Sequence, residues 1–324
     1  MATRILVLAS IYSEEFTEES PAGQSFLKAH PECEWRFRSY TNCTAEDMAW
    51  AEVLYGVPDP AALREAKNLR WLHLMTAGVN NYADPSLFPD PKPIFTRSAG
   101  VHAPTMAEHA IGLALAVSRN FPLLYAHQKE HDWHFEVARN ELFGSTVLML
   151  GTGYLAKELI RRLQGFDCRI IGVRRDCTKP MPEGVERVYP IEELLNVLPQ
   201  ADYLFNTLPL TPATRRILST EAFKAAKPNM VLINIGRGGT VDTPALVEAL
   251  RNGEIGGAGL DVTDPEPLNR DNPLWDLPNV IISPHCSAVS GTTNSRRNEM
   301  FLRQLDRFLK GEALEGVVDL SVGY

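Results

Sequence analysis

The sequence has no excess of basic residues and no run of Lys or Arg. Its 32 Lys and Arg residues are outnumbered by 40 Asp and Glu residues, which gives a formal net charge of −8. Proteins that bind nucleic acids need positive charge to neutralise phosphates, and anionic membranes attract basic segments. We therefore expect neither a nucleic-acid partner nor a membrane partner.

Cysteines are few and long apolar runs are missing. The five cysteines are odd in number and form no C-x-x-C pair, so we expect no disulfide framework and favour the reducing cytoplasm. The longest apolar stretch, residues 110–117, is far shorter than the roughly 18 residues of a membrane span. With 44% apolar and 22% charged residues over 324 positions, the chain is typical of a globular protein with two domains.

Short aliphatic runs alternate with helical patterns from end to end. Strands are predicted over residues 4–9, 34–38, 52–55, 71–75, 94–97, 146–150, 169–173, 203–208, 231–235, 259–262 and 280–283, with a last one from Gly316. Helices are predicted over residues 60–68, 105–119, 154–165, 191–198, 219–226, 243–252 and 291–309. This alternation predicts βαβ units and parallel sheets. Helices 105–119 and 291–309 lie where the chain would leave a discontinuous first domain and return to it.

A glycine-rich turn follows the predicted strand at residues 146–150. Gly151, Gly153 and Ala156 form a G-x-G-x-x-A pattern between that strand and an amphipathic helix. The first glycine permits the tight turn, the second lets a pyrophosphate approach the backbone, and a small third residue allows the helix to pack. The helix N-terminus then offers free N–H groups to phosphates. The pattern predicts a dinucleotide-binding domain.

The residue after the next predicted strand bears on which dinucleotide binds. NAD sites usually carry an acidic residue there, but this sequence has Arg174 and Arg175. A carboxylate would repel a 2′-phosphate, whereas a guanidinium binds one with two hydrogen bonds. We therefore expect NADP in preference to NAD. NAD stays an alternative, because Asp176 is close enough in sequence to take the place of the acidic residue.

Three titratable residues lie at or just beyond predicted strand ends in the second half. They are Arg237 in N-I-G-R-G-G, Glu266 in D-P-E-P and His285 in S-P-H. In open α/β sheets, ligands bind at the carboxyl ends of the strands. With the dinucleotide turn and the segment L-P-L-T-P-A-T at residues 208–214, these motifs resemble those of the D-isomer-specific 2-hydroxyacid dehydrogenases, which include glyoxylate/hydroxypyruvate reductases. The likeness covers nearly the whole chain.

The resemblance implies a fold, an assembly and a reaction. The expected fold is α/β, with two doubly wound, Rossmann-like parallel-sheet domains and an active site in the cleft between them. Residues 1–100 plus 289–324 would form the discontinuous substrate domain, and residues 101–288 the NAD(P)-binding domain. The expected assembly is a homodimer. The expected reaction is hydride transfer between NADP and a small 2-oxo or 2-hydroxy acid.

The resemblance also assigns roles that suit the chemistry of a 2-oxo acid. Arg237 would bind the carboxylate and polarise the carbonyl, and His285 would be the general acid that protonates the carbonyl oxygen. Glu266 would orient the imidazole and favour its protonated form. Residues expected to contact the cofactor are Thr105, Gly151, Gly153, Tyr154, Leu155, Arg174, Arg175, Leu208, Pro209, Thr214, Ile235, Gly236, Asp261 and Ser287. Those expected to contact the substrate are Gly78, Val79, Asn80 and Arg237.

Other members of the same class stay open to different degrees. Formate dehydrogenases are disfavoured, because they carry Gln where this chain has Glu266. A phosphoglycerate dehydrogenase is an alternative, although the sequence shows no added regulatory domain before Tyr324. A dinucleotide-sensing, corepressor-like binding protein without significant turnover is the alternative from another class.

Three histidines are spaced as if on one face of a helix. His127, His131 and His134 follow an i, i+4, i+7 pattern, which places side chains on one helix face. No H-E-x-x-H pattern accompanies them, and hydride transfer from a nicotinamide needs no metal. We therefore expect no metal ion. Trp133 is expected to pack at a subunit or domain contact.

Overall fold

The computed structural model describes residues 2–9, 16–82, 84–138 and 140–320. The chain divides into two compact units. The first unit comprises the residues up to His102 together with those from Ser290 onward, and the second is Ala103–Val289. These divisions lie one or two residues from the domain boundaries expected from the sequence.

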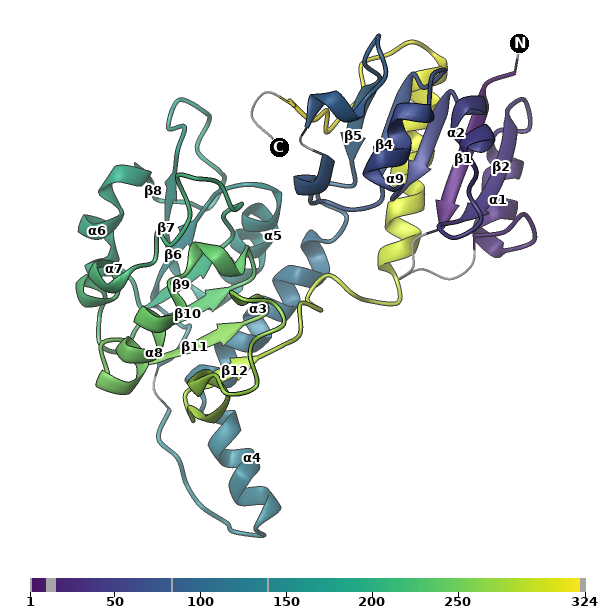
Figure 1. The fold of residues 1–324 in the computed structure, drawn as a ribbon. Coiled ribbons are helices and arrows are strands. Elements are labelled where there is room, and N and C mark those ends of the chain that lie inside the picture. Colours follow the sequence, from purple (N-terminus) through teal and green to yellow (C-terminus); the bar gives the residue numbers. More distant parts are fainter. Residues whose placement is uncertain (1, 10–15, 83, 139, 321–324) are drawn as a thin grey trace. The chain divides into compact units, whose positions relative to one another are not determined.

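The first unit is built on five parallel strands in the order β2-β1-β3-β4-β5 (Figure 1). The strands are β1 (Arg4–Ala9), β2 (Glu34–Ser39), β3 (Val53–Gly56), β4 (Trp71–Leu74) and β5 (Ile94–Arg97). The helices are α1 (Pro21–Ala29), α2 (Ala45–Trp50), α9 (Thr293–Leu309) and the short 3-10 helices η1 (Pro60–Glu65), η2 (Asn80–Tyr82) and η3 (Pro85–Leu87). The chain therefore enters this unit twice, because α9 comes from the far end of the sequence.

Aromatic side chains fill one side of the first unit's sheet. The ring of Phe301 on α9 stacks on Tyr55 of β3 at 4.1 Å and on Trp71 of β4 at 5.5 Å. All three side chains are fully buried. Beside them, buried His73 hydrogen-bonds Thr96 through its Nδ1 at 2.7 Å. Aromatic pairs at such spacings add stability beyond the area they bury, so α9 completes this core.

The second unit holds seven parallel strands in the order β12-β11-β10-β9-β6-β7-β8. The strands are β6 (Thr146–Leu150), β7 (Arg169–Arg174), β8 (Arg187–Pro190), β9 (Tyr203–Asn206), β10 (Val231–Asn234), β11 (Gly257–Leu260) and β12 (Val280–Ile282). The main helices are α3 (Ala103–Ser118), α4 (Phe121–Lys129), α5 (Tyr154–Leu163), α6 (Leu194–Val197), α7 (Thr220–Ala225) and α8 (Thr243–Asn252). The central strands are apolar on both faces, as expected of a sheet covered on both sides.

The connections of this sheet change direction between β6 and β9. From β6 the chain proceeds outward to β7 and β8, and it then returns to β9 on the other side of β6. Ligands of open α/β sheets bind at such a switch point, outside the carboxyl ends of the strands. The loops after β6 and β9 lie side by side at this point. The N–H of Thr207, which follows β9, donates to the carbonyl of Leu150 at the end of β6 at 2.9 Å.

Three local expectations from the sequence were wrong, and some elements were not predicted. The helix expected at residues 60–68 is the 3-10 helix η1, and the one expected at 191–198 is a series of single turns around α6. The strand expected from Gly316 is reduced to one antiparallel bridge between Val317 and Thr96. Strand β8 was not predicted, because it is a short edge strand that ends in a proline.

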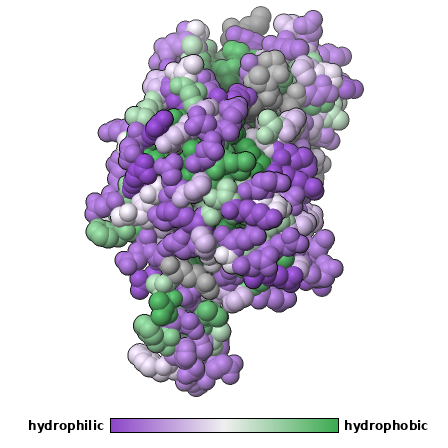
Figure 2. All heavy atoms as spheres, turned by 90° about the vertical axis from the view of Figure 1, so that its left-hand side faces the viewer, coloured by the Kyte–Doolittle hydropathy of each residue, from purple (hydrophilic) through white to green (hydrophobic). Residues whose placement is uncertain are grey.

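Helix α4 and the segment after it project from the second unit as an arm (Figure 1). We call residues 121–138 the arm. It exposes the apolar side chains Phe121, Tyr125, Trp133, Phe135 and Val137, and Figure 2 shows apolar groups gathered on this projection. Because α4 ends at Lys129, the expectation of three histidines on one helix face was wrong. Among the described residues, no helix is both long and apolar enough to cross a membrane.

Candidate functional site

The glycine-rich turn joins β6 to α5. Gly151 has φ +93°, and a Cβ there would lie 2.7 Å from the Thr207 hydroxyl, so the position requires glycine. Gly153 is the N-cap of α5 and makes no side-chain capping hydrogen bond, and the space where its Cβ would stand is open. Ala156 is fully buried against the sheet. The turn therefore leaves backbone N–H groups at the start of α5 accessible to an anion.

Arg174 ends β7 next to this turn. Its guanidinium lies 3.4 Å from the hydroxyl of Thr152 and donates to the carbonyls of Lys179 and Pro180. Its buried Nε has no hydrogen-bond partner among the described residues. Asp176 accepts from the N–H and hydroxyl of Thr178, at 3.0 and 2.6 Å. The carboxylate that was the alternative ribose ligand is thus engaged in its own turn, while the arginine faces the phosphate-binding turn.

The three catalytic candidates lie in loops after β10, β11 and β12. His285 Nδ1 and Glu266 Oε1 are in hydrogen-bonding contact, and both side chains are about half exposed. Arg237 donates to the carbonyl of Gly236 at 2.8 Å. Burial lowers the pKa of the Arg237 guanidinium, and the nearby charge of Glu266 opposes that shift. The structure therefore brings a histidine and a carboxylate together as an acid–base pair, with an arginine in the electric field of the carboxylate.

Asp261, at the end of β11, organises the loop that carries His285. Its Oδ1 accepts from the Ser283 hydroxyl at 2.7 Å and from the Cys286 N–H at 2.9 Å, and its Oδ2 accepts from the Ser287 N–H at 3.1 Å. Burial alone would raise the pKa of Asp261, but these hydrogen bonds outweigh burial and hold the pKa below its usual value. The carbonyl of Asp261 also accepts from the His285 N–H at 2.9 Å. Asp261 thereby holds the backbone of His285, Cys286 and Ser287 and the side chain of Ser283.

A second polar network was not predicted from the sequence. Asn206 at the end of β9 donates from its Nδ2 to Asn234 Oδ1 at 3.0 Å and to the Thr240 hydroxyl at 2.7 Å. Thr240 in turn donates to the carbonyl of Arg237 at 2.6 Å. All three polar side chains are buried. The signal available in the sequence was an asparagine ending each of two apolar strands.

The other expected cofactor residues lie around the same strand ends. Thr214 donates to the carbonyl of Pro209 at 2.6 Å and so closes the loop after β9, and a Cβ at Gly236 would lie 2.8 Å from the carbonyl of Leu208. The buried hydroxyl of Ser287 has no hydrogen-bond partner in the described chain. The remaining candidates are placed as follows: Thr105 in α3, Tyr154 and Leu155 in the first turn of α5, Ile235 after β10 and Arg175 after β7.

The expected substrate loop follows β4 in the first unit. Arg97 donates to the carbonyl of Ala77 at 2.9 Å, and the Thr76 hydroxyl donates to the carbonyl of Gly78 at 2.8 Å. Within the part of the chain that the structure describes, the N–H groups of Gly78 and Val79 donate no hydrogen bond. Free N–H groups beside an arginine suit an anion. The side chain of Asn80 lies outside the described residues.

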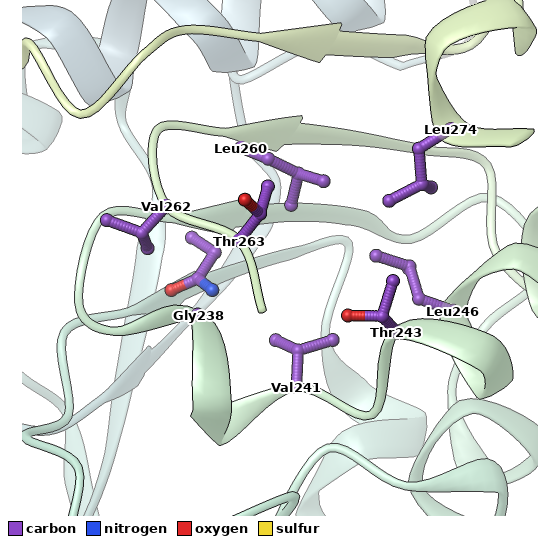
Figure 3. A pocket seen from close by; sticks show the side chains of 9 residues that line it. Gly238, Val241, Thr243, Leu246, Leu260, Val262, Thr263 and Leu274 are labelled. Atoms are coloured by element: carbon purple, nitrogen blue, oxygen red, sulfur yellow. The ribbon is translucent and has the colours of Figure 1, made fainter. Parts of the chain in front are cut away.

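A hollow lies behind the Arg237 loop, but it is too small for a ligand. Its volume is about 10 Å³, and Figure 3 shows Val241, Leu246 and Leu260 among the side chains that line it. This is about the space that one water molecule occupies. The hollow is a packing defect between the sheet and α8.

Comparisons with known proteins agree with this arrangement. The family model described as D-isomer specific 2-hydroxyacid dehydrogenase, NAD binding domain, matches residues 111–287. A glyoxylate reductase of Korarchaeum cryptofilum is 34% identical over 236 residues, which are 70% of this chain and 69% of the relative.

Two solved structures cover almost the whole chain. A probable 2-hydroxyacid dehydrogenase from Rhizobium etli, in complex with NADP, HEPES and L(+)-tartaric acid, superimposes with a TM-score of 0.81 at 29% identity and covers 100% of both chains. An NADPH-dependent glyoxylate/hydroxypyruvate reductase from Sinorhizobium meliloti, in complex with NADP and sulfate, gives a TM-score of 0.81 at 28% identity and covers 99% of this chain and 100% of its own. The protein belongs to the D-isomer-specific 2-hydroxyacid dehydrogenase family.

Proposed function

We propose that this protein is an NADP-preferring reductase that converts a small 2-oxo acid, of the size of glyoxylate or hydroxypyruvate, to the D-2-hydroxy acid. The observation that carries the proposal is the contact between His285 and Glu266 in loops at the carboxyl edge of the sheet. The names of the similar glyoxylate and hydroxypyruvate reductases support the substrate class.

The proposed chemistry assigns one task to each group. Arg237 binds the substrate carboxylate and polarises the carbonyl, because its planar guanidinium offers paired donors. His285 gives a proton to the carbonyl oxygen, and Glu266 keeps the imidazole oriented and favours its charged form. The N–H groups of Gly78 and Val79, which donate no hydrogen bond within the described residues, are proposed as further donors to the carboxylate. A bound reduced nicotinamide supplies the hydride.

The residues present fit a dinucleotide. The open space at Gly153 and the uncapped start of α5 suit a pyrophosphate. The buried hydroxyl of Ser287, which has no hydrogen-bond partner among the residues that the structure describes, suits a polar group of the cofactor. Arg174 and Arg175 would bind the 2′-phosphate that distinguishes NADP from NAD, and the unpartnered Nε of Arg174 supports this role.

The test mixes the protein with NADPH or NADH and one of five 2-oxo acids: glyoxylate, hydroxypyruvate, pyruvate, 2-oxoisocaproate or phenylpyruvate. The absorbance of the reduced nicotinamide measures the rate of its oxidation. We expect faster turnover with NADPH and a loss of about 10²–10⁴-fold in His285→Ala, which is typical of a removed general acid. A preference for NADH would contradict the cofactor assignment alone. Tight binding of NADPH without turnover of any 2-oxo acid would favour a dinucleotide sensor.

We also propose that the protein is a homodimer in which the partner chain packs against the arm. The exposed side chain of Trp133 is accompanied by Phe135 and Val137, which are 82% and 71% exposed. Contiguous apolar groups of this kind mark interaction surfaces, and two-fold oligomers are the commonest assembly. Light scattering should give twice the mass of the chain, and Phe135→Asp should shift the protein toward the monomer. A wild-type monomer would exclude the proposal.

A further inference from the structure

The end of α4 is shaped by a turn that reverses the chain. The N–H of Asp132 donates to the carbonyl of His127 at 2.9 Å, and the N–H of His131 donates to that of Gln128 at 3.2 Å. Between them, His131 has a left-handed backbone with φ +56°. This pair of hydrogen bonds is the Schellman motif, which ends many helices. It turns the chain back along the last turn of α4, so residues after the helix come to lie beside His127.

The reversal stacks two imidazoles. The rings of His127 and His134 lie 4.4 Å apart between centroids, with 24° between their planes. Asp132 Oδ2 lies 3.1 Å from His127 Nδ1 and 3.9 Å from His134 Nδ1. One carboxylate oxygen therefore faces the same edge of both rings. These residues also line a hollow of about 480 Å³ at the end of the arm.

The opposite edge of the two rings faces a second carboxylate. Glu136 Oε1 lies 3.2 Å from His127 Nε2 and 3.8 Å from His134 Nε2. Histidines that bind metals commonly donate their other ring N–H to a carboxylate, which fixes the tautomer and makes the ligand nitrogen more basic. Glu136 is placed to do this for His127, so that Nδ1 of the ring can serve as the ligand atom on the side of Asp132.

We propose that His127, Asp132 and His134 bind one divalent transition-metal ion, such as Zn²⁺. Ligand atoms of the three residues lie within 4.8 Å of one another. Ligands of a tetrahedral zinc ion lie about 3.3 Å apart, given bonds of about 2.0–2.1 Å, so binding requires the exposed side chains of Asp132 and His134 to rotate toward the partly buried His127. Two imidazoles and a carboxylate are donors that zinc accepts, and the fourth position is open to water.

The proposal departs from the expectation of no metal, for a physical reason. Helical spacing predicted that the three histidines lie on one face of a helix. In the structure the helix ends at Lys129, His131 lies in the turn, and the turn brings His134 beside His127. His131 takes the left-handed position of the turn, which favours glycine and which a few polar residues also adopt. The inference rests on these contacts and is independent of the proposed reductase activity.

The test is calorimetric titration with Zn²⁺ after treatment of the intact protein with EDTA and desalting. We expect one ion per chain, with affinity that falls on acidification because protons compete for the imidazoles. His134→Ala and Asp132→Ala should each weaken binding at least tenfold, and Glu136→Gln should weaken it roughly tenfold, as outer carboxylates do. The matched control is His131→Gly, which also removes a histidine, suits the left-handed position and should bind Zn²⁺ normally.

Three outcomes would overturn the proposal. The first is no binding of Zn²⁺ by the wild-type protein. The second is undiminished binding in His134→Ala, with circular dichroism and light scattering unchanged. The third is binding that survives His134→Ala but is lost in Cys286→Ser, because that would place the ion at the other group of potential ligands, His109, Asp261 and Cys286.

Discussion

The two units share one kind of sheet but differ in how polar groups are held. In the second unit, the polar residues at the strand ends are tied into networks around Asp261 and Asn206. In the first unit, the N–H groups of Gly78 and Val79 after β4 donate no hydrogen bond within the described residues, and buried His73 lies in an aromatic core. This difference fits our proposal that the second unit fixes the geometry of the reacting groups, while the first offers donors to an anion.

The largest expected effect tests the aromatic core. Trp71→Ala should lower the free energy of unfolding by about 3–5 kcal/mol, because it empties a fully buried space beside Phe301. Urea unfolding followed by circular dichroism measures this. Binding of NADPH, which we assign to the second unit, should survive in folded protein. In the second unit, Leu204→Ala should cost about 2–5 kcal/mol and weaken NADPH binding as well.

A smaller effect is expected at Asp261. Asp261→Asn should destabilise the protein by about 2–3 kcal/mol, because an amide cannot accept from as many donors as the buried carboxylate does. It should also lower kcat, since the loop carrying His285 loses its support. The matched control is Asp242→Asn, the N-cap of α8, where asparagine caps equally well. Equal effects of the two substitutions on kcat would refute a positioning role.

The first unit should carry a distinct acid sensitivity. Burial lowers the pKa of His73 to about 3. An unfolded chain binds this proton near pH 6.5, so the group stabilises the folded state fully above that pH and progressively less as the pH falls toward 3. Between pH 6.5 and pH 5, His73 should lower the free energy of unfolding by about 2 kcal/mol. Urea midpoints across this range should fall less steeply in His73→Gln, and parallel curves would count against the assignment.

The smallest effect concerns cofactor choice. Arg174→Ala should raise KM for NADPH about tenfold, which corresponds to 1.4 kcal/mol, and leave KM for NADH unchanged. Steady-state kinetics with both cofactors measure the difference. Arg161→Ala, on the exposed face of α5, removes the same charge and should change neither value. A rise for both cofactors with Arg174→Ala would mean that this arginine does not recognise the 2′-phosphate.

The sheet of the second unit was largely predictable because its central strands are apolar on both faces. The observed bounds of β1, β5 and β6 are those expected, and in β1 and β6 the aliphatic run stops at a serine or a glycine. Edge strand β8 and helices α1, α2 and α4 were missed. Strand β8 is only four residues long, α1 and α2 bury two residues each, and α4 buries none. An element that buries many residues has a recognisable pattern of apolar residues in the sequence, whereas an element that buries few residues has a much weaker pattern.

The candidate site was predictable one residue at a time, but its contacts were not. Motifs pointed to Glu266 and His285, and the structure brings them into contact. Nothing in the spacing indicated that Asp261 would hold the loop of His285, or that Asn206 and Asn234 would support the Arg237 loop. Such networks join residues that are far apart in sequence. A single asparagine at a strand end belongs to no repeating pattern, so its hydrogen-bond partner cannot be inferred from the sequence.

The position of α9 has a consequence for synthesis of the chain. The second unit is continuous, so all of its strands have been translated before α9 is made. The sheet of the first unit is translated earliest, yet the aromatic ring that fills its core, Phe301, arrives last. The first unit therefore leaves the ribosome without the ring that stacks on Tyr55 and Trp71. Until the C-terminal helix emerges, that surface is open to chaperones and to wrong partners.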